Sequence, residues 1–249
     1  INQDFTTAPE ISQIFGECIA IFFLNFFDAF KESGLTKTFF ELGPGKGTLA
    51  NDILRVIKKK INTININLIE RSNKLINEQK TLIEKKISNV NINWSNNLDL
   101  KKNHGPIFFY CNEFFDSLPI SQFFYSRNVL FEKRVSINKE NKICFVNVRS
   151  NEKIPSYFSE MKNNSIFEYS FQTKFFLDQI FKYITNNGGV LLLFDYGPIL
   201  KKGYDSIQCI HKNKKCSIFD FPCHSDITHH VDFQYMKNLA QNYSLNCHG

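Results

Sequence analysis

A glycine-rich turn between two apolar segments is the first feature of the sequence that could bind a ligand. It reads Glu41-Leu42-Gly43-Pro44-Gly45-Lys46-Gly47-Thr48, with glycine at every second position from Gly43 to Gly47. Glycine lets the backbone approach a bound molecule closely, and the helix predicted to follow offers free N–H groups in its first turn. The spacing is one residue shorter than the dinucleotide pattern G-x-G-x-x-G. We expect Gly43, Gly45 and Gly47 to form a cofactor loop, with a purely structural glycine turn as the alternative.

Two carboxylates accompany this turn and indicate which cofactor would fit it. Glu41 stands just before the glycines, where it suits a cationic amino-acid group better than a pyrophosphate. Glu70 closes the next predicted strand, at the place where the acidic residue of dinucleotide-binding folds accepts hydrogen bonds from ribose hydroxyls. S-adenosyl-L-methionine (SAM) carries an ammonium group, a sulfonium and a ribose. The residues therefore favour SAM as the cofactor.

A third polar group follows the fourth predicted strand, in the segment Asn112-Glu113-Phe114-Phe115-Asp116-Ser117-Leu118-Pro119. Ligands of open α/β sheets bind beyond the carboxyl ends of the strands, so we expect Asn112, Glu113 and Asp116 to face the reactive end of the cofactor. Carboxylates could hold an arginine side chain, which is a poor nucleophile until a carboxylate fixes it and accepts a proton. The alternative is an acidic cap on a following helix, with Asp116 as the capping residue.

Two further polar segments lie near the C-terminal end of the sequence. Asp195-Tyr196-Gly197 closes the fifth predicted strand, and a cluster between Asp226 and Asp232 precedes a helical pattern over 233–239. His230 or Tyr196 could relay a proton, although each could equally be a structural residue.

The cysteines predict no metal centre. There are seven, an odd number, without a C-x-x-C pair, which favours reduced thiols in a cytosol-like compartment. The tightest cluster does not have the spacing of a zinc site and comprises Cys209, His211, Cys216, Cys223 and His224.

Strands and helices alternate along the chain and must position these groups. A parallel, doubly wound sheet follows from this order. The predicted strands cover 38–42, 64–69, 90–94, 107–111 and 190–194, and the helices 49–57, 74–87 and 174–184. A long helix with one apolar stripe is expected from Ile11 onward, started by a capping box of Thr7 and Glu10 around Pro9.

An insertion interrupts this α/β frame. Residues 123–148 alternate apolar and polar around the turn Asn138–Asn141, which predicts an antiparallel hairpin, whereas 197–225 have no clear periodicity and are expected to form a long loop. We therefore divide the chain into an N-terminal helix with the cofactor-binding half of the core (1–122), a hairpin segment that faces the substrate (123–170) and the C-terminal half of the core (171–249).

Composition excludes several classes of protein. With 43% hydrophobic residues the chain can fold around a core, and its longest apolar run, interrupted at Asn25 and Asp28, is too short to span a bilayer. No secretory signal is visible. The net charge of +6 is scattered over loops and helix ends, so no nucleic-acid partner is expected.

Five motifs, in order over almost the whole chain, resemble those of the MidA-like class I SAM-dependent methyltransferases. They are residues 4–13, 41–48, 112–119, 195–197 and 226–233. The resemblance implies a Rossmann-like α/β fold, SAM as cofactor and methylation of a protein arginine, since mitochondrial members modify a subunit of respiratory complex I. It also implies that Thr6, Thr7 and Glu10 line the cofactor pocket, that Glu41 and Glu70 contact SAM, and that Glu113 orients the acceptor.

The resemblance has departures and alternatives. Members often have a proline where this chain has Phe171, and they extend beyond both ends of this sequence, so we expect a fragment of the family's core. A cytoplasmic location is implied for a bacterial source and the mitochondrial matrix for a eukaryotic one. A second hypothesis is an assembly chaperone that binds a partner through the hairpin 123–148, with exposed aromatics such as Phe131. Methylation of a small molecule or nucleic acid is disfavoured, because no Asn-Pro-Pro-aromatic segment follows the fourth strand.

Overall fold

The protein is described by a computed structural model that covers residues 7–29, 37–61, 63–83, 90–158, 165–198 and 203–249. The chain divides into two compact units. The first, here the sheet unit, consists of Thr6–Phe114 and Gln179–Asp195. The second, here the antiparallel unit, contains Phe115–Asp178 and Tyr196–Gly249.

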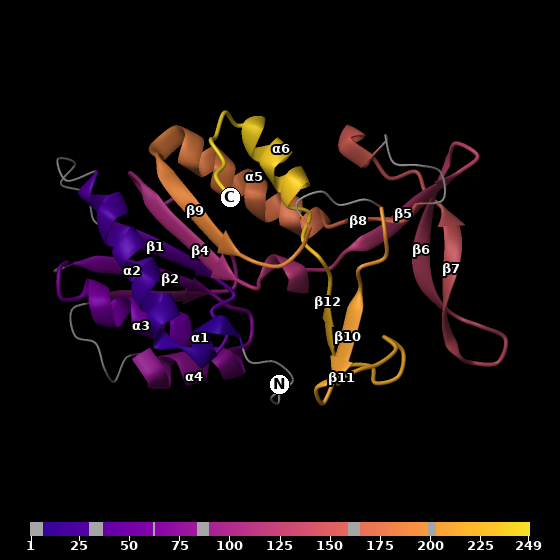
Figure 1. Cartoon of the computed structure of the whole chain (residues 1–249), viewed down its shortest axis with the longest axis horizontal. Helices are drawn as coiled ribbons and strands as arrows, with labels where there is room; N and C mark the ends of the chain where they lie inside the picture. Colours follow the sequence, from indigo (N-terminus) through magenta and orange to yellow (C-terminus); the bar gives the residue numbers. More distant parts are fainter. Residues whose placement is uncertain (1–6, 30–36, 62, 84–89, 159–164, 199–202) are drawn as a thin grey trace. The chain divides into compact units, whose positions relative to one another are not determined.

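The sheet unit is built on five parallel strands in the order β3-β2-β1-β4-β9 (Figure 1). Their bounds are β1 Lys37–Leu42, β2 Ile64–Ile69, β3 Val90–Ser95, β4 Ile107–Asn112 and β9 Gly189–Phe194. The predicted parallel α/β sheet is therefore confirmed. The strand order reverses between β1 and β4, which is the point where open α/β sheets bind their ligands.

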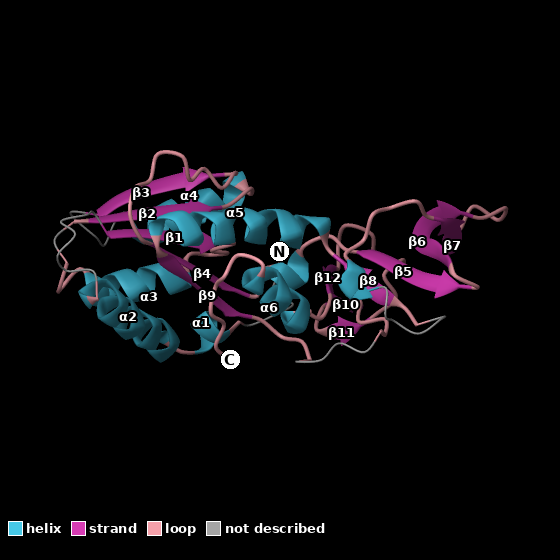
Figure 2. Ribbon diagram, turned by 90° about the horizontal axis from the view of Figure 1, so that it is seen from above, coloured by secondary structure: helices cyan, strands magenta, loops and turns pink. Residues whose placement is uncertain are grey.

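One face of this sheet packs against helices α2 (Gln13–Asp28) and α3 (Thr48–Ile57), as Figure 2 shows. The ring of Phe23 in α2 lies edge-on to Phe39 of β1 and Phe108 of β4, with centroid distances of 4.6 and 3.5 Å. All three side chains are buried. This aromatic layer explains why strands buried on both faces read as nearly continuous apolar runs.

The opposite face carries the alternate residues of the same strands. Phe40 of β1 packs against Phe109 of β4, which in turn contacts Tyr183 of α5 (Phe171–Asn187). Helix α4 (Asn73–Ile83) connects β2 to β3. The last residues of the helix predicted over 74–87 lie outside the described residues.

The first predicted helix is interrupted. Ser12 has an extended backbone and separates a short α1 (Ala8–Ile11) from α2, and its hydroxyl accepts a hydrogen bond from the Ile14 amide at 3.3 Å. Thr7 precedes α1 but makes no side-chain cap, so the predicted capping box is wrong. The break turns Ile11 and Ile14 away from the core, and both are exposed.

The antiparallel unit contains a four-stranded sheet in the order β7-β6-β5-β8. Its strands are β5 Ser121–Ser126, β6 Val129–Ile137, β7 Ile143–Arg149 and β8 Phe167–Tyr169. The predicted hairpin is thus antiparallel, but a second turn at Arg127 and Asn128, both with positive φ, makes it three strands. Phe131 is half-buried and stacks on Phe124, so it is not the exposed aromatic that the sequence suggested.

Two strands of a second small sheet, β11-β10-β12, lie in the stretch 197–225 that was predicted as a loop, and the third follows directly after it. Strand β10 (Gln208–His211) pairs with β11 (Lys214–Lys215) and with β12 (Asp226–Thr228). Helix α6 (Phe233–Gln241) follows, and the Asp232 carboxylate caps it by accepting the Tyr235 amide at 2.9 Å. Two short 3-10 turns, η2 (Phe115–Ser117) and η3 (Ser156–Phe158), complete the unit. Within the described residues, none of the helices has the length and apolar character needed to cross a bilayer.

Candidate active site

The glycine turn forms a tight loop between β1 and α3. Gly43, Gly45 and Gly47 all have positive φ, at 63°, 55° and 82°. A β-carbon on Gly43 would lie 2.6 Å from the Phe114 ring, whereas one on Gly45 would meet no described atom within 4 Å. Gly43 is therefore required by packing, and the backbone at Gly45 is open for the close approach of a ligand.

A buried glutamine of α4 holds this loop in place. The Gln79 carboxamide donates to the Gly45 carbonyl at 2.7 Å and accepts the indole N–H of Trp94 at 2.9 Å. Its side chain is fully buried and lies against Gly47, where a β-carbon would come within 3.0 Å of it. Sequence reasoning missed Gln79. The available signal was a polar residue four positions before Ile83 on the buried side of the predicted helix.

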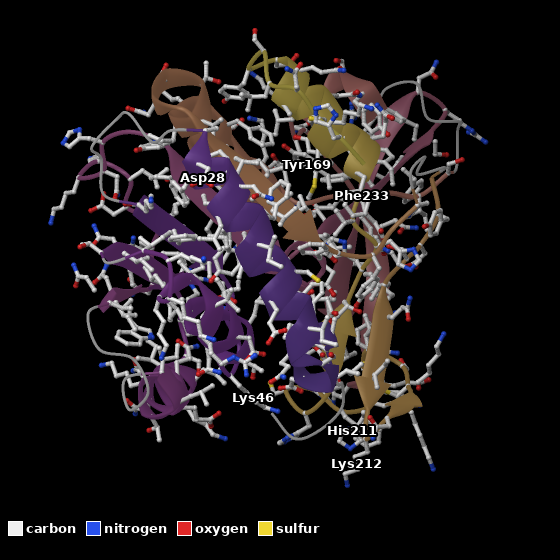
Figure 3. All side chains as sticks on the ribbon, turned by 60° about the vertical axis from the view of Figure 1, so that its left-hand side comes forward. Asp28, Lys46, Tyr169, His211, Lys212 and Phe233 are labelled. Atoms are coloured by element: carbon white, nitrogen blue, oxygen red, sulfur yellow. The ribbon has the colours of Figure 1, made fainter. Side chains whose placement is uncertain are left out.

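Helix α1 reaches the same loop through an ion pair. The Lys46 ammonium lies 2.8 Å from a Glu10 carboxylate oxygen, and Figure 3 shows Lys46 toward the end of α2 opposite to Asp28. The Lys46 side chain is half exposed, so the pair contributes no more than about 1 kcal/mol to stability. Glu10 thus lies beside the glycine loop, Thr7 directly precedes α1, and Thr6 lies outside the described residues.

The Glu70 carboxylate is fixed just beyond the end of β2. One oxygen accepts the amides of Arg71 and Ser72, both at 2.8 Å, and its own amide donates to the Ser95 carbonyl at 2.9 Å. The second oxygen accepts no hydrogen bond within the described part of the chain. Leu42 and Ile69, the last residues of β1 and β2, pair in register. The Glu70 carboxylate therefore lies at the same end of the sheet as the glycine loop, where the parallel strands have their carboxyl ends.

Glu41 occupies a different environment, inside the sheet. Its carboxyl is buried and accepts the Tyr110 hydroxyl at 2.9 Å. Burial raises the pKa of Glu41 to about 8, and the hydrogen bond from Tyr110 offsets only part of that effect. At neutral pH the group is therefore mostly a neutral acid.

Asn112 and Glu113 stand at the carboxyl end of β4. The Asn112 carboxamide donates to a Glu113 carboxylate oxygen at 3.4 Å, and the Glu113 amide donates to the Phe194 carbonyl at 2.8 Å. Glu113 has a φ of 49°, in the left-handed region that costs a non-glycine residue about 1–2 kcal/mol. Strain of this kind gathers at functional positions, so Glu113 is the strongest candidate for contact with a substrate.

Asp116 belongs to the antiparallel unit and is buried there. Burial raises the pKa of its carboxyl, while a hydrogen bond from Tyr196 and the charge of His229 oppose the rise. Its carbonyl accepts the His229 amide at 3.0 Å. The alternative reading of Asp116 as a helix cap is wrong, because strand β5 follows Pro119.

His230 stands between two polar side chains of the same unit. Its Nδ1 lies 2.7 Å from the Tyr204 hydroxyl, and its Nε2 lies 3.2 Å from the Gln208 carboxamide nitrogen. Because that nitrogen is a donor, Nε2 accepts and Nδ1 carries the proton toward Tyr204. A neighbouring contact joins two sequence motifs, since a β-carbon on Gly197 would lie 2.1 Å from the Val231 carbonyl oxygen.

Most of the predicted site residues therefore lie at one end of the sheet, where its parallel strands have their carboxyl ends. Leu42 is in register with both Ile69 and Cys111, so the groups that follow these residues share that end. Glu41 lies within the sheet, and Asp116 belongs to the antiparallel unit. Among the described residues, no group of three or more potential ligands could hold a metal ion, and the cysteine–histidine cluster forms no such centre.

Comparisons with known proteins show which family and which fold the chain resembles. A family model described as "Putative S-adenosyl-L-methionine-dependent methyltransferase" matches residues 18–249. The human mitochondrial protein arginine methyltransferase NDUFAF7 is 31% identical, over 96% of this chain and 59% of its own length. The Caenorhabditis elegans homologue is 30% identical, over 96% of this chain and 61% of its own. The chain thus spans about three fifths of these relatives.

A solved structure has the same fold. A Burkholderia thailandensis protein, crystallised bound to S-adenosyl-homocysteine, superposes with a TM-score of 0.78 over 97% of this chain and 63% of its own, at 19% identity.

Proposed function

The chain belongs to this family of S-adenosyl-L-methionine-dependent methyltransferases, and we propose that it binds SAM at the glycine loop and transfers its methyl group to a protein arginine. One observation carries the proposal. The Glu70 carboxylate, oriented by two backbone amides, stands with one oxygen unpartnered among the described residues, at the same end of the sheet as the open backbone at Gly45.

The residues present fit SAM. A carboxylate with one open oxygen suits the hydroxyls of a ribose, and the loop at Gly45 has room for backbone contact with a ligand. The first turn of α3 begins after Gly47 and offers amide donors. Glu41, as the family resemblance implies, would approach the ammonium group, and a nearby cation would favour its ionised form.

SAM supplies an electrophilic methyl group when it is bound. The protein must then hold the acceptor in line and take up positive charge. The strained backbone of Glu113 directs a carboxylate from the end of β4, with Asn112 donating to it. We propose that Glu113 orients the guanidinium of the substrate arginine and assists its loss of a proton, and that Asp116 is a second acidic partner.

The acceptor is proposed by class. Relatives at about 30% identity bear the name protein arginine methyltransferase, which supports a protein arginine. The five-motif resemblance points further, to a subunit of respiratory complex I or its bacterial counterpart. The mitochondrial names of the relatives support a matrix location for a eukaryotic source, and the same resemblance supports the cytoplasm for a bacterial one.

Cofactor binding is tested by titration calorimetry with SAM. We expect Glu70→Ala to lose at least tenfold in affinity, because a charge-assisted hydrogen bond contributes about 1.5–3 kcal/mol. The matched control is Glu140→Ala, which removes an exposed carboxylate from the turn between β6 and β7. Equal affinities for the wild type and Glu70→Ala would remove Glu70 from the site, and no binding by the wild type would refute the cofactor.

An assembly chaperone is the second candidate. Two in-register pairs of apolar side chains on the β6–β7 ribbon are exposed. They are Val135 with Phe145 and Ile137 with Ile143. A surface of this kind could bind a partner protein. Incubation with SAM labelled in its methyl group, in a lysate from cells that lack the gene, separates the two functions. An enzyme labels a protein band, whereas a binding module labels none.

A further inference from the structure

Two of the seven cysteines face each other across the β10–β11 hairpin. The Cys209 and Cys216 sulfur atoms lie 3.2 Å apart, and the Cys216 amide donates to the Cys209 carbonyl at 3.0 Å. The side chain of Cys209 is buried in the antiparallel unit, while that of Cys216 is half-buried. Both are free thiols.

The hairpin fixes this pairing. Lys212 and Asn213 form its two-residue turn, both with positive φ, so that His211 pairs with Lys214 and Ile210 with Lys215. The next position along the ladder brings Cys209 opposite Cys216, and Figure 3 shows His211 and Lys212 at the tip of the hairpin. Directly opposed residues of an antiparallel pair have Cα atoms about 4.5–5.5 Å apart. That separation lies within the range that a disulfide spans.

We propose that Cys209 and Cys216 form an oxidisable dithiol that closes to a disulfide across the β10–β11 hairpin on reaction with a small-molecule disulfide. The cysteine count alone hides this pair, because the six residues between the two thiols match neither a C-x-x-C motif nor a zinc spacing. The turn at Lys212 and Asn213 makes them neighbours.

The exchange balances with a disulfide such as oxidised glutathione. The Cys216 thiolate attacks one sulfur of the oxidant, forming a mixed disulfide and releasing one glutathione thiolate. The Cys209 thiolate then attacks the Cys216 sulfur, which forms the intramolecular bond and releases the second. Two electrons pass to glutathione, and the two thiol protons end on the two glutathione molecules.

Cys216 is the cysteine that a reagent reaches first, because Cys209 is the more buried of the two. Partial burial, the Cys209 thiol and Asp220 raise the pKa of Cys216 to about 11, so its thiolate is scarce at neutral pH. The exchange is therefore best run at mildly alkaline pH, where the exposed thiols of Cys18 and Cys247 report that the oxidant has acted.

Peptide mapping tests the proposal. The reduced protein is incubated with oxidised glutathione, the remaining thiols are alkylated, and the product is digested without reductant. Trypsin cleaves after Lys212 and Lys215, so it separates the two cysteines, and chymotrypsin cleaves after Phe219, which separates Cys216 from Cys223. We expect a peptide pair linked from Cys209 to Cys216 that is absent after treatment with dithiothreitol.

Two variants sharpen the result. Cys209→Ser should leave Cys216 as a glutathione adduct, whereas Cys223→Ser, the matched control, should keep the linked pair. The proposal is overturned when Cys18 or Cys247 has reacted fully while Cys209 and Cys216 remain alkylated or carry separate glutathione adducts. A link from Cys209 to Cys223 would overturn it as well. The wild-type map decides the question even where a variant folds poorly.

Discussion

The Gln79 carboxamide donates its hydrogen bond to the Gly45 carbonyl at 2.7 Å, so a side chain of α4 sets the backbone of the loop that follows β1. The opposite end of the same carboxamide accepts the Trp94 indole N–H from β3. One buried side chain thus joins three segments of the sheet unit. The glycines allow the loop its positive φ angles, and the hydrogen bond from Gln79 holds its backbone in one conformation in the folded protein.

Replacing Gln79 by leucine should therefore loosen the loop. The change leaves the Trp94 N–H and the Gly45 carbonyl, which are both partly buried, without these partners, and this costs about 1–3 kcal/mol of stability. If Gln79 positions the loop, the affinity for SAM should fall by more than the fraction of unfolded protein explains. The checks are chemical denaturation and calorimetry on folded protein. Asn77→Leu on the exposed side of α4 is the control, and equal SAM affinities in all three proteins would limit Gln79 to a structural role.

The loop glycines offer a second comparison. Gly45→Ala introduces strain at a φ of 55° but no clash, so it should cost about 1 kcal/mol of stability. Gly188→Ala is the matched control, since Gly188 has a φ of 80°, its added β-carbon makes only ordinary contacts, and it follows α5 away from the loop. We expect similar losses of stability and a loss of SAM affinity in Gly45→Ala alone. Loss of affinity in both variants would contradict the assignment of the cofactor to this loop.

The parallel sheet and the position of its polar residues at one end of it followed from the sequence, because each depends on local signals. Apolar runs marked β1, β2 and β4, and the rule that ligands bind at strand ends placed Glu70 and Glu113. Residues that act through long-range packing could not be identified from the sequence. Gln79 contacts Gly45 across 34 positions, and no pattern in a single sequence links them.

Two sequence predictions failed for a local reason. The apolar stripe from Ile11 continued through Ser12, yet the Ser12 hydroxyl competes for the Ile14 amide and splits the helix there. Strands β10 and β11 were missed because they are only four and two residues long. The turn between them also contains no glycine, since the two residues with positive φ are Lys212 and Asn213.

The buried carboxyl of Glu41 predicts how stability depends on pH. Its pKa is raised from 4.5 to about 8 in the folded protein, so the native state binds this proton more tightly than the unfolded chain does. The contribution of this proton to the free energy of unfolding is fully present below pH 4.5 and is lost as the pH rises through about 8. Each pKa unit corresponds to about 1.4 kcal/mol, so the loss amounts to a few kcal/mol.

Glu41→Gln should remove this dependence, because the amide stays neutral and still accepts the Tyr110 hydroxyl. The free energy of unfolding, measured by urea denaturation between pH 5 and pH 9, is expected to fall less steeply in the variant than in the wild type. Calorimetry on the same variant tests the second role of Glu41. A weaker affinity for SAM supports a contact with the ammonium group, and an unchanged affinity restricts Glu41 to the interior of the sheet.

Glu113 has a strained backbone and also a proposed role in catalysis, so its variants should have separate effects on stability and on activity. Glycine adopts a φ of 49° without penalty, and Glu113→Gly should therefore gain up to about 1 kcal/mol of stability while losing methyl transfer. Glu113→Gln keeps the strain and the shape but removes the charge. We expect it to retain SAM affinity and to lose at least tenfold in kcat for an arginine-containing protein substrate. Arg127→Gly at a φ of 50°, in the turn between β5 and β6, controls for the removal of strain alone and should leave kcat unchanged. A Glu113→Gln variant with wild-type turnover would show that the strained backbone serves another purpose.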